Sequence, residues 1–296
     1  MNLTGVFAPV PTPFDEQDRV DVERLRAAFT RWLASPLTGF VILGSNGEAA
    51  LLDEQESEQV IAEARAVVPR NRPFIVGTGR ESTKATIVAT QRAATLGADA
   101  VLVRTPGFFK SQMTADAFDR HYRSIADASP VPVLLYNFTA VTGVNLAPAV
   151  ASSLASHPNI IGMKESGGDI GQMSALVDGT PEDFQVLAGS ATTFYASLCV
   201  GAVGGILALG CVLPEACVRL FQLVREGHNE EARAQQRTLV SLARLLGSFH
   251  GVAGLKAALD LVGIDVGWPR PPLLPVNETI RATLRGELAK IQEVLA

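Results

Sequence analysis

Residues 132–164 read PVLLYNFTAVTGVNLAPAVASSLASHPNIIGMK, which is an apolar run, a longer mixed stretch and a second apolar run. Short, nearly continuous apolar runs are typical of strands in a parallel sheet that is buried on both faces. The stretch between them is long enough for the crossover helix that two parallel strands require. This segment therefore predicts a strand, a helical connection and a second, parallel strand.

The same unit repeats on both sides of this segment. Apolar runs recur about every 20 to 34 residues: VFAPV from 6, FVILG from 40, PFIVG from 73, AVLVR from 100, PVLLY from 132, IIGMK from 160, FQVLA from 184 and GGILA from 204. The segments between them begin like helices, for example with Asp53 and Glu56 in a capping-box spacing. Eight such units predict an α/β fold, a TIM (β/α)8 barrel, with a doubly wound open sheet as the alternative.

The chain continues for about 88 residues after the eighth run, which is more than one closing helix needs. The pattern of these residues is helical throughout, as in NEEARAQQRTLVSLARLL from 229 and NETIRATLRGELAKIQEVL from 277. We expect a catalytic barrel over residues 1–225 and a C-terminal helical extension over residues 226–296. The extension would pack on the barrel or on a partner subunit.

Composition narrows the class of protein. Apolar residues make up 47% and charged residues 19% of the chain, which excludes a disordered or coiled-coil protein. The net charge of −5, without a basic run, argues against nucleic acid as a partner. Glycines interrupt the longest apolar stretch, no basic leader begins the chain, and the three cysteines lack CxxC spacing. We expect a cytoplasmic protein with no membrane partner.

Lys164 is the most informative single residue, because it ends the sixth apolar run. Only five lysines occur in the chain, against 20 arginines. Functional groups of TIM barrels lie at the carboxyl ends of the strands, and alternation places Lys164 on the same strand face as Gly162. An amine buried in the barrel mouth favours its uncharged form, which a nucleophile needs. The alternative is a lysine that merely extends from the strand end into solvent.

Tyr136 ends the fifth run and so lies next to Lys164 in the predicted sheet. Adjacent strands are about 4.8 Å apart, so the two side chains can converge on one small ligand. A phenol beside an imine-forming lysine can relay protons while the imine forms and breaks down. The alternative is a tyrosine half-buried for packing alone.

The second run is followed by Gly44-Ser45-Asn46-Gly47-Glu48, a turn of small and polar residues. Such a turn presents backbone N–H groups and polar side chains, which suits a carboxylate or a phosphate. It is not a phosphate-binding Walker A loop, since no Gly-Lys-Ser/Thr follows, and the GTGRES stretch at 77 fails the dinucleotide pattern. An ordinary turn is the alternative interpretation.

No pattern in the sequence predicts a metal site or a cofactor. No HxH, HExxH or GxSxG motif is present, and the four histidines are isolated: His121, His157, His228 and His250. Glycines 201, 204 and 205 near the eighth run either let a ligand approach the backbone or relieve crowding where the barrel closes.

Three motifs occur together in order: GSNGE at 44, YN at 136 and GMKESGG at 162. With them, the chain from about residue 5 to 275 resembles the pyruvate-dependent class I aldolase family that includes dihydrodipicolinate synthase and N-acetylneuraminate lyase. Further stretches are most similar to 4-hydroxy-2-oxoglutarate aldolase, namely EST at 81, GADAVLV at 97, HPNIIGMKESGGD at 157 and DFQVLAGSA at 183.

The resemblance implies roles for six residues. Lys164 would form a Schiff base with a 2-oxo acid, and Tyr136 would relay protons with Ser45. Ser45 and Asn46 would hold the carboxylate of the 2-oxo acid. The remaining two would bind substrate: Ile206, through a backbone carbonyl that faces the site, and Ser166, near the second substrate.

The resemblance also implies that no cofactor is used and that the protein assembles as a homotetramer, a dimer of dimers. Three departures from the family pattern stand out. Val141 occupies the position of an arginine that binds the aldehyde's carboxylate in dihydrodipicolinate synthases. Phe109, in TPGFFK, aligns with a tyrosine that usually completes the hydroxyl relay. The family's YN-x-Pro is here Tyr136-Asn137-Phe138-Thr139.

The expected function is that of a Schiff-base-forming lyase. It would cleave or form a 4-hydroxy-2-oxo acid such as 4-hydroxy-2-oxoglutarate, with pyruvate as one partner and an aldehyde, such as glyoxylate, as the other. Alternatives within the same chemistry are 4-hydroxy-tetrahydrodipicolinate synthase, an aldolase or dehydratase for 2-oxo-3-deoxy sugar acids, and an aldolase for an apolar aldehyde. An alternative from another class is a non-catalytic protein that binds a 2-oxo acid.

Overall fold

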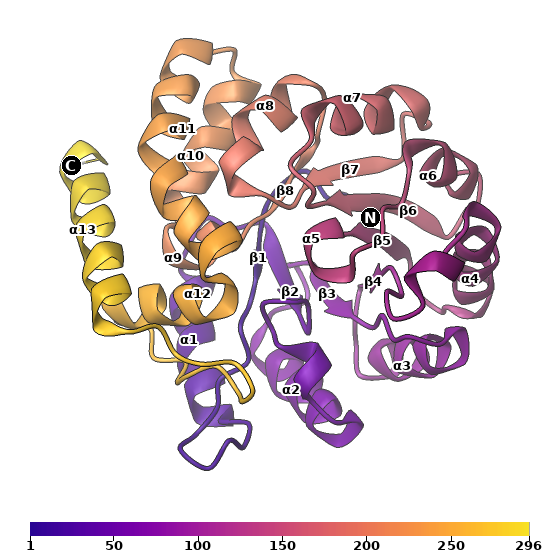
Figure 1. Cartoon of the computed structure of the whole chain (residues 1–296), viewed down its shortest axis with the longest axis horizontal. Helices are drawn as coiled ribbons and strands as arrows, with labels where there is room; N and C mark the ends of the chain where they lie inside the picture. Colours follow the sequence, from indigo (N-terminus) through magenta and orange to yellow (C-terminus); the bar gives the residue numbers. More distant parts are fainter. Residues whose placement is uncertain (296) are drawn as a thin grey trace.

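The computed structural model describes residues 1–295, without the side chain of Leu295, and contains a closed barrel of eight parallel strands (Figure 1). Neighbouring strands pair in sequence order, and β8 closes the barrel against β1. The strands are β1 (Gly5–Pro9), β2 (Gly39–Ile42), β3 (Phe74–Gly77), β4 (Ala100–Arg104), β5 (Val133–Asn137), β6 (Ile160–Glu165), β7 (Gln185–Ala188) and β8 (Gly204–Ile206). The predicted TIM barrel is confirmed, and the open-sheet alternative is wrong.

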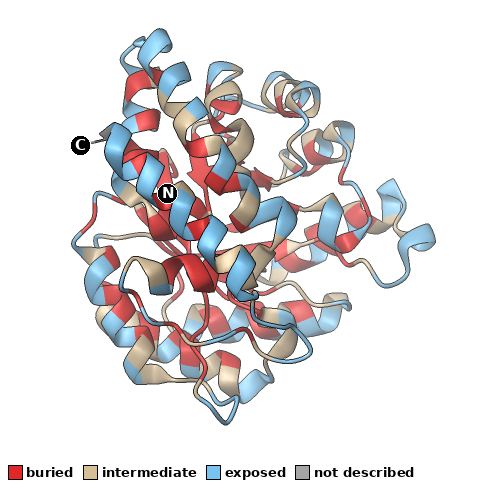
Figure 2. Cartoon of the chain, turned by 60° about the vertical axis from the view of Figure 1, so that its left-hand side comes forward, coloured by how far each residue is buried: buried red, intermediate tan, exposed pale blue. Residues whose placement is uncertain are grey.

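Helices surround the barrel and turn their buried faces inward (Figure 2). The capping box predicted at Asp53 is confirmed, because Asp53 accepts a hydrogen bond from the Glu56 N–H at 2.8 Å and donates its own N–H to the Glu56 carboxylate at 3.0 Å. One or two helices follow each of the first seven strands. They are α1 (Val22–Leu33), α2 (Glu54–Val67), α3 (Thr83–Thr95), α4 (Ala115–Ala128), α5 (Thr139–Thr142), α6 (Pro148–Leu154), α7 (Ile170–Gly179) and α8 (Phe194–Cys199).

Most residues after β8 are helical, as predicted, but residues 262–277, between α12 and α13, form no helix. The helical residues form α9 (Leu209–Val212), α10 (Pro214–Arg225), α11 (Asn229–Arg244), the π-helical turn η4 (Leu245–Phe249), α12 (Gly251–Leu261) and α13 (Glu278–Leu295). Helix α13 lies beside α11 and α12 (Figure 1). One apolar core joins Ala8 of β1 to Ile291 of α13. The domain boundary at residue 225 stays a prediction. Within residues 1–295, no helix is both long and apolar enough to cross a bilayer.

The interior of the barrel is filled by a second, smaller apolar cluster. Inward-facing residues of seven strands supply most of it: Phe7, Val41, Ile75, Ala100, Leu102, Leu134, Tyr136, Leu187 and Ile206. Alternating strand residues stack in layers in such a barrel, so the interior is packed rather than open. Polar groups can therefore gather only at an end of the barrel, and Tyr136 lies at the carboxyl end of its strand.

His121 is a buried histidine between α3 and α4, where its Nδ1 lies 2.9 Å from the hydroxyl of Thr83. Its ring packs edge-on against Tyr122, and its Nε2 has no hydrogen-bond partner among the described residues. Burial, with a smaller contribution from the nearby Arg104, lowers the pKa of His121 to about 4, although Glu81 opposes the shift. The folded protein therefore holds this histidine neutral.

We expect His121 to make the fold sensitive to acid. Between about pH 4 and 6.5 the unfolded chain binds a proton at His121 that the folded chain does not, so the free energy of unfolding falls as the pH falls through this range. The loss reaches roughly 2 kcal/mol between pH 7 and pH 5. Urea unfolding of wild type and His121→Gln at both pH values measures it, since the variant lacks this contribution. The exposed His228→Gln is the control; identical pH slopes in all three proteins would contradict the prediction.

Candidate active site

Lys164 and Tyr136 lie side by side at the carboxyl ends of β6 and β5, where the sheet register pairs them directly. The Lys164 Nζ lies 4.2 Å from the centre of the Tyr136 ring. Both side chains are buried, at 5% and 3% exposure. The Tyr136 hydroxyl lies 3.3 Å from the Ser45 Oγ, which comes from the loop after β2. The structure thus brings together the three residues predicted to act on the substrate.

The next residue on each strand holds this pair in place. The amide of Asn137 donates to the Glu165 carboxylate at 2.8 Å, and Gln172 of α7 donates to the same carboxylate at 2.9 Å. The side-chain oxygen of Asn137 accepts from the Leu146 N–H at 3.0 Å. Asn137 and Glu165 are almost fully buried, so these hydrogen bonds are little weakened by water. They fix the ends of β5 and β6 relative to each other.

A cavity of about 720 Å³ opens above these strand ends. All six residues predicted to form the site line it: Ser45, Asn46, Tyr136, Lys164, Ser166 and Ile206. Gly189, directly after β7, makes the close arrangement possible. A Cβ at this position would lie 1.8 Å from the Ser166 Oγ and 3.0 Å from the Lys164 Cε. The Ser166 hydroxyl is buried and has no hydrogen-bond partner among residues 1–295, so it is available to a ligand.

Two of the departures from the family pattern, at Val141 and in the stretch that contains Phe138, lie in the cavity wall. Val141 lines the cavity and is 60% exposed. Phe108 lines it as well, whereas Phe109, the residue aligned with the family's tyrosine, is not among the lining residues. The two rings meet edge to face, with centres 5.0 Å apart. Neither ring can carry a proton, so the hydroxyl chain within the described residues runs from Tyr136 to Ser45.

A buried ion pair at the cavity wall was not predicted from the sequence. Glu48 ends the GSNGE loop in the left-handed backbone conformation, with φ +54°, and its carboxylate lies 2.7 Å from the Nζ of Lys256 in α12. Both side chains are at most 1% exposed. A second carboxylate oxygen of Glu48 accepts the backbone N–H of Arg270 at 2.8 Å. The loop that carries Ser45 is thus anchored to the C-terminal helices.

Lys256 has a full set of partners around its ammonium group. It donates to the carbonyls of Thr12 and Trp268, at 2.8 and 2.9 Å, and lies over the ring of Phe14. Burial lowers the pKa of Lys256 to about 8, although Glu48 opposes the shift. One signal in the sequence could have revealed this group: Lys256 interrupts the apolar segment GLKAALDLVG, where a lysine needs a buried partner.

A closed parallel barrel with a buried amine, a phenol and a hydroxyl at its carboxyl end defines a class of barrel enzymes whose substrate binds at the strand ends. Comparison with known proteins gives the family. Residues 2–291 match the model of the dihydrodipicolinate synthetase family, and the chain belongs to that family. Its members are pyruvate-dependent class I aldolases, so this protein is a lyase of the pyruvate-dependent class.

Relatives with two different activities are equally similar to the chain. It is 36% identical over 292 residues to a 4-hydroxy-tetrahydrodipicolinate synthase of Exiguobacterium, covering 99% of both chains. It is also 36% identical over 288 residues to a probable mitochondrial 4-hydroxy-2-oxoglutarate aldolase of Emericella nidulans, covering 96% of this chain and 93% of the other. Among solved structures, a prophage protein of the same family from E. coli K12, in complex with pyruvate, superposes with a TM-score of 0.92 at 29% identity, covering 99% of both chains.

Proposed function

We propose that the protein is a Schiff-base aldolase for a 4-hydroxy-2-oxo acid, most simply 4-hydroxy-2-oxoglutarate. The observation that carries the proposal is the contact chain from the Lys164 amine to the Tyr136 ring and from the Tyr136 hydroxyl to Ser45, inside one cavity. An imine-forming amine needs a proton relay beside it, and this chain supplies one.

The reaction follows from these positions. The Lys164 amine attacks the ketone carbon of the substrate, and water leaves as a protonated imine forms. The C4 hydroxyl then loses its proton, the C3–C4 bond breaks, and its electron pair moves into the imine, which becomes an enamine of pyruvate. The aldehyde departs, C3 takes up a proton, and hydrolysis frees pyruvate and the amine. Tyr136 moves protons on and off the reacting oxygen atoms, with Ser45 as the next hydroxyl in the chain.

The remaining residues would bind the substrate. Ser45 and Asn46 lie on the glycine-rich turn after β2, where backbone N–H groups suit the carboxylate next to the ketone. Ile206 would turn its backbone carbonyl to the site from β8, and the free Ser166 hydroxyl would reach the second substrate. We also propose that the protein is cytoplasmic and assembles as a dimer of dimers. Its chain would divide into a catalytic barrel over residues 1–225 and a helical extension over residues 226–296.

Trapping with borohydride tests the proposal directly. The protein is incubated with pyruvate and borohydride, its intact mass is measured, and the modified peptide is mapped. We expect one pyruvyl adduct, on Lys164. An unmodified protein, or an adduct on another lysine, would refute imine chemistry at this site and favour a protein that only binds 2-oxo acids.

A second candidate is 4-hydroxy-tetrahydrodipicolinate synthase, the activity for which several similar relatives are named. Val141 argues against it, because the valine offers no charge to the aldehyde's carboxylate where synthases of the family carry an arginine. Product analysis with pyruvate and a panel of aldehydes separates the candidates. Turnover of glyoxylate supports the first, and turnover of aspartate semialdehyde alone supports the second.

Replacing Tyr136 with phenylalanine removes the hydroxyl and keeps the ring that stacks on Lys164. We expect kcat for aldol cleavage to fall by about 10² to 10⁴-fold, because proton transfer contributes on that scale. Imine trapping would become slower but would still reach completion, since the amine remains. Tyr195→Phe, on a tyrosine that does not line the cavity, is the matched control. An unchanged kcat in Tyr136→Phe would show that water or another group relays the protons.

A further inference from the structure

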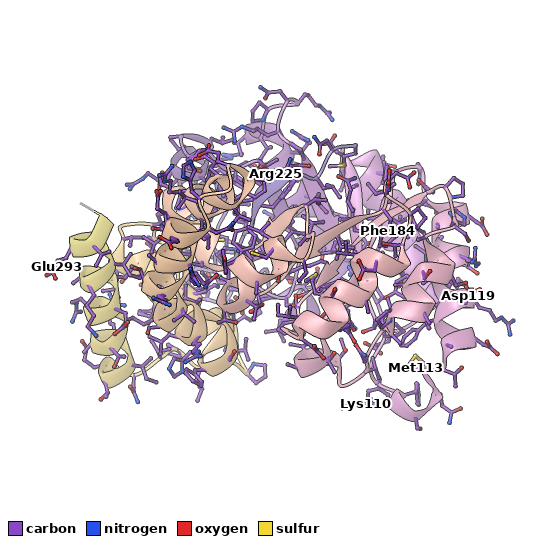
Figure 3. All side chains as sticks on the ribbon, turned by 90° about the horizontal axis from the view of Figure 1, so that it is seen from above. Lys110, Met113, Asp119, Phe184, Arg225 and Glu293 are labelled. Atoms are coloured by element: carbon purple, nitrogen blue, oxygen red, sulfur yellow. The ribbon has the colours of Figure 1, made fainter. Side chains whose placement is uncertain are left out.

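Lys110 lies at the mouth of the cavity, in the loop after β4, and the proposed function gives it no role. Figure 3 shows Lys110 near one edge of the molecule, in the same loop as Met113. Its Nζ lies across Gly143, since a Cβ on that glycine would be 2.7 Å from the Nζ. Val141 and Thr142, which come just before Gly143, line the same cavity. Lys110 thus lies beside the position where the family's arginine is missing.

Lys110 differs from most charged residues of the cavity wall because it has no ion-pair partner among the described residues. Six charged residues line the cavity, and three ion pairs account for four of them: Glu48 with Lys256, Arg80 with Glu54, and Arg104 with Glu81. The other two are Lys164 and Lys110. Within residues 1–295, neither has a carboxylate oxygen within 4 Å. Within the described residues, these two lysines are therefore the charged-type side chains of the cavity wall that lack a carboxylate partner.

The first of these lysines, Lys164, is consumed by the reaction itself. On the proposed function, Lys164 forms a positively charged imine, and the carboxylate next to the ketone of the same substrate balances it. Lys110 then remains as one positive charge at the mouth. A carboxylate at the far end of the substrate carries one negative charge and matches it, whereas a phosphate monoester carries nearly two.

We propose that Lys110 binds the distal carboxylate of a dicarboxylic 2-oxo acid and so makes the enzyme selective for an anionic aldehyde. Gly143 serves this role because its missing side chain leaves room for the lysine to lie against the end of α5. Val141 does not compete for the carboxylate. The proposal rests on the proposed function, and it names the substrate class of the same site.

Imine trapping with two keto acids of equal length tests the proposal without requiring turnover. 2-Oxoglutarate carries the distal carboxylate, and 2-oxopentanoate carries a methyl group in its place. The half-saturating concentration of each acid is measured by borohydride trapping and intact mass. We expect wild type to prefer 2-oxoglutarate by about tenfold or more, because a hydrogen bond to a charged group contributes on that scale. The preference should shrink in high salt, since Lys110 is exposed.

Variants test whether the preference for 2-oxoglutarate comes from the Lys110 side chain. Lys110→Gln should bind the two acids within about twofold of each other, and Lys110→Arg should keep the preference. Lys84→Gln is the matched control, because Lys84 is exposed and does not line the cavity. Pyruvate has no distal carboxylate, so its trapping should be equal in all four proteins.

The outcomes separate the two proposals. If wild type traps pyruvate and shows no preference for 2-oxoglutarate, or if Lys110→Gln retains the preference, the role of Lys110 is overturned while the imine chemistry stands. If pyruvate is not trapped at all, both proposals fall. A preference in wild type that Lys110→Gln loses and Lys110→Arg keeps supports the assignment.

Discussion

Lys164→Ala is expected to form no pyruvyl adduct and to lose at least about 10⁴-fold in kcat for aldol cleavage. The reason is chemical, because no other side chain among the described cavity residues is an amine beside the Tyr136 ring. Removing a covalent nucleophile leaves only the catalysis that binding and the remaining polar groups supply. Mass spectrometry after borohydride trapping, together with a pyruvate-release assay, measures both effects.

Two controls make the Lys164 result specific. Lys164→Arg keeps the positive charge but cannot form the imine, so it should be as inactive as the alanine variant. Lys84→Ala changes an exposed lysine outside the cavity and should trap pyruvate like wild type. Circular dichroism checks that all variants are folded. A pyruvyl adduct that persists on Lys164→Ala would show that another lysine carries the chemistry.

Lys256→Met is expected to lower the free energy of unfolding by about 3 to 5 kcal/mol, because it leaves the buried Glu48 carboxylate without its counter-charge. The remaining partner of that carboxylate, the Arg270 N–H, cannot neutralise it. Glu48→Gln should also destabilise, since Lys256 then loses its only carboxylate partner among the described residues. Urea unfolding of the single variants and of the double variant completes a mutant cycle.

The double variant tests whether the stability loss comes from an unpaired buried charge. Glu48→Gln/Lys256→Met buries no charge, so it should be more stable than the Lys256→Met variant. It should still bind pyruvate less tightly than wild type, because the loop that carries Ser45 and Asn46 loses its anchor on α12. Single variants that each cost less than about 1 kcal/mol would contradict the buried pair as a stabilising contact.

The barrel could be predicted because each of its strands corresponds to a short apolar run in the sequence. A run such as IIGMK can satisfy its backbone and bury both faces only in a central parallel strand, and β6 (Ile160–Glu165) lies where the run predicts it. Lys164 and Tyr136 could be found for the same reason, because strand ends of a barrel meet at one place. Their contact follows from the register of β5 and β6, which the two runs made plausible.

Contacts that depend on the three-dimensional path of loops could not be predicted. Phe108 lines the cavity and its neighbour Phe109 does not, a difference that depends on how one loop turns. The partner of Glu48 could not be found either, because Lys256 is about two hundred residues away and belongs to a helix whose docking side the pattern leaves open. The significance of Lys110 depends on ion pairs that the sequence does not show, because these pairs account for every charged residue of the cavity wall except Lys110 and Lys164.

The distance along the chain between Glu48 and Lys256 has a consequence for biosynthesis. At 5 to 20 residues per second, a ribosome needs roughly 10 to 40 s to reach Lys256 after it has made Glu48. Throughout that time the nascent loop carries a carboxylate whose permanent counter-ion has not been made, and β1 also waits for β8 to close the ring. The substrate-binding loop is thus among the first parts of the protein to be synthesised and among the last to become functional.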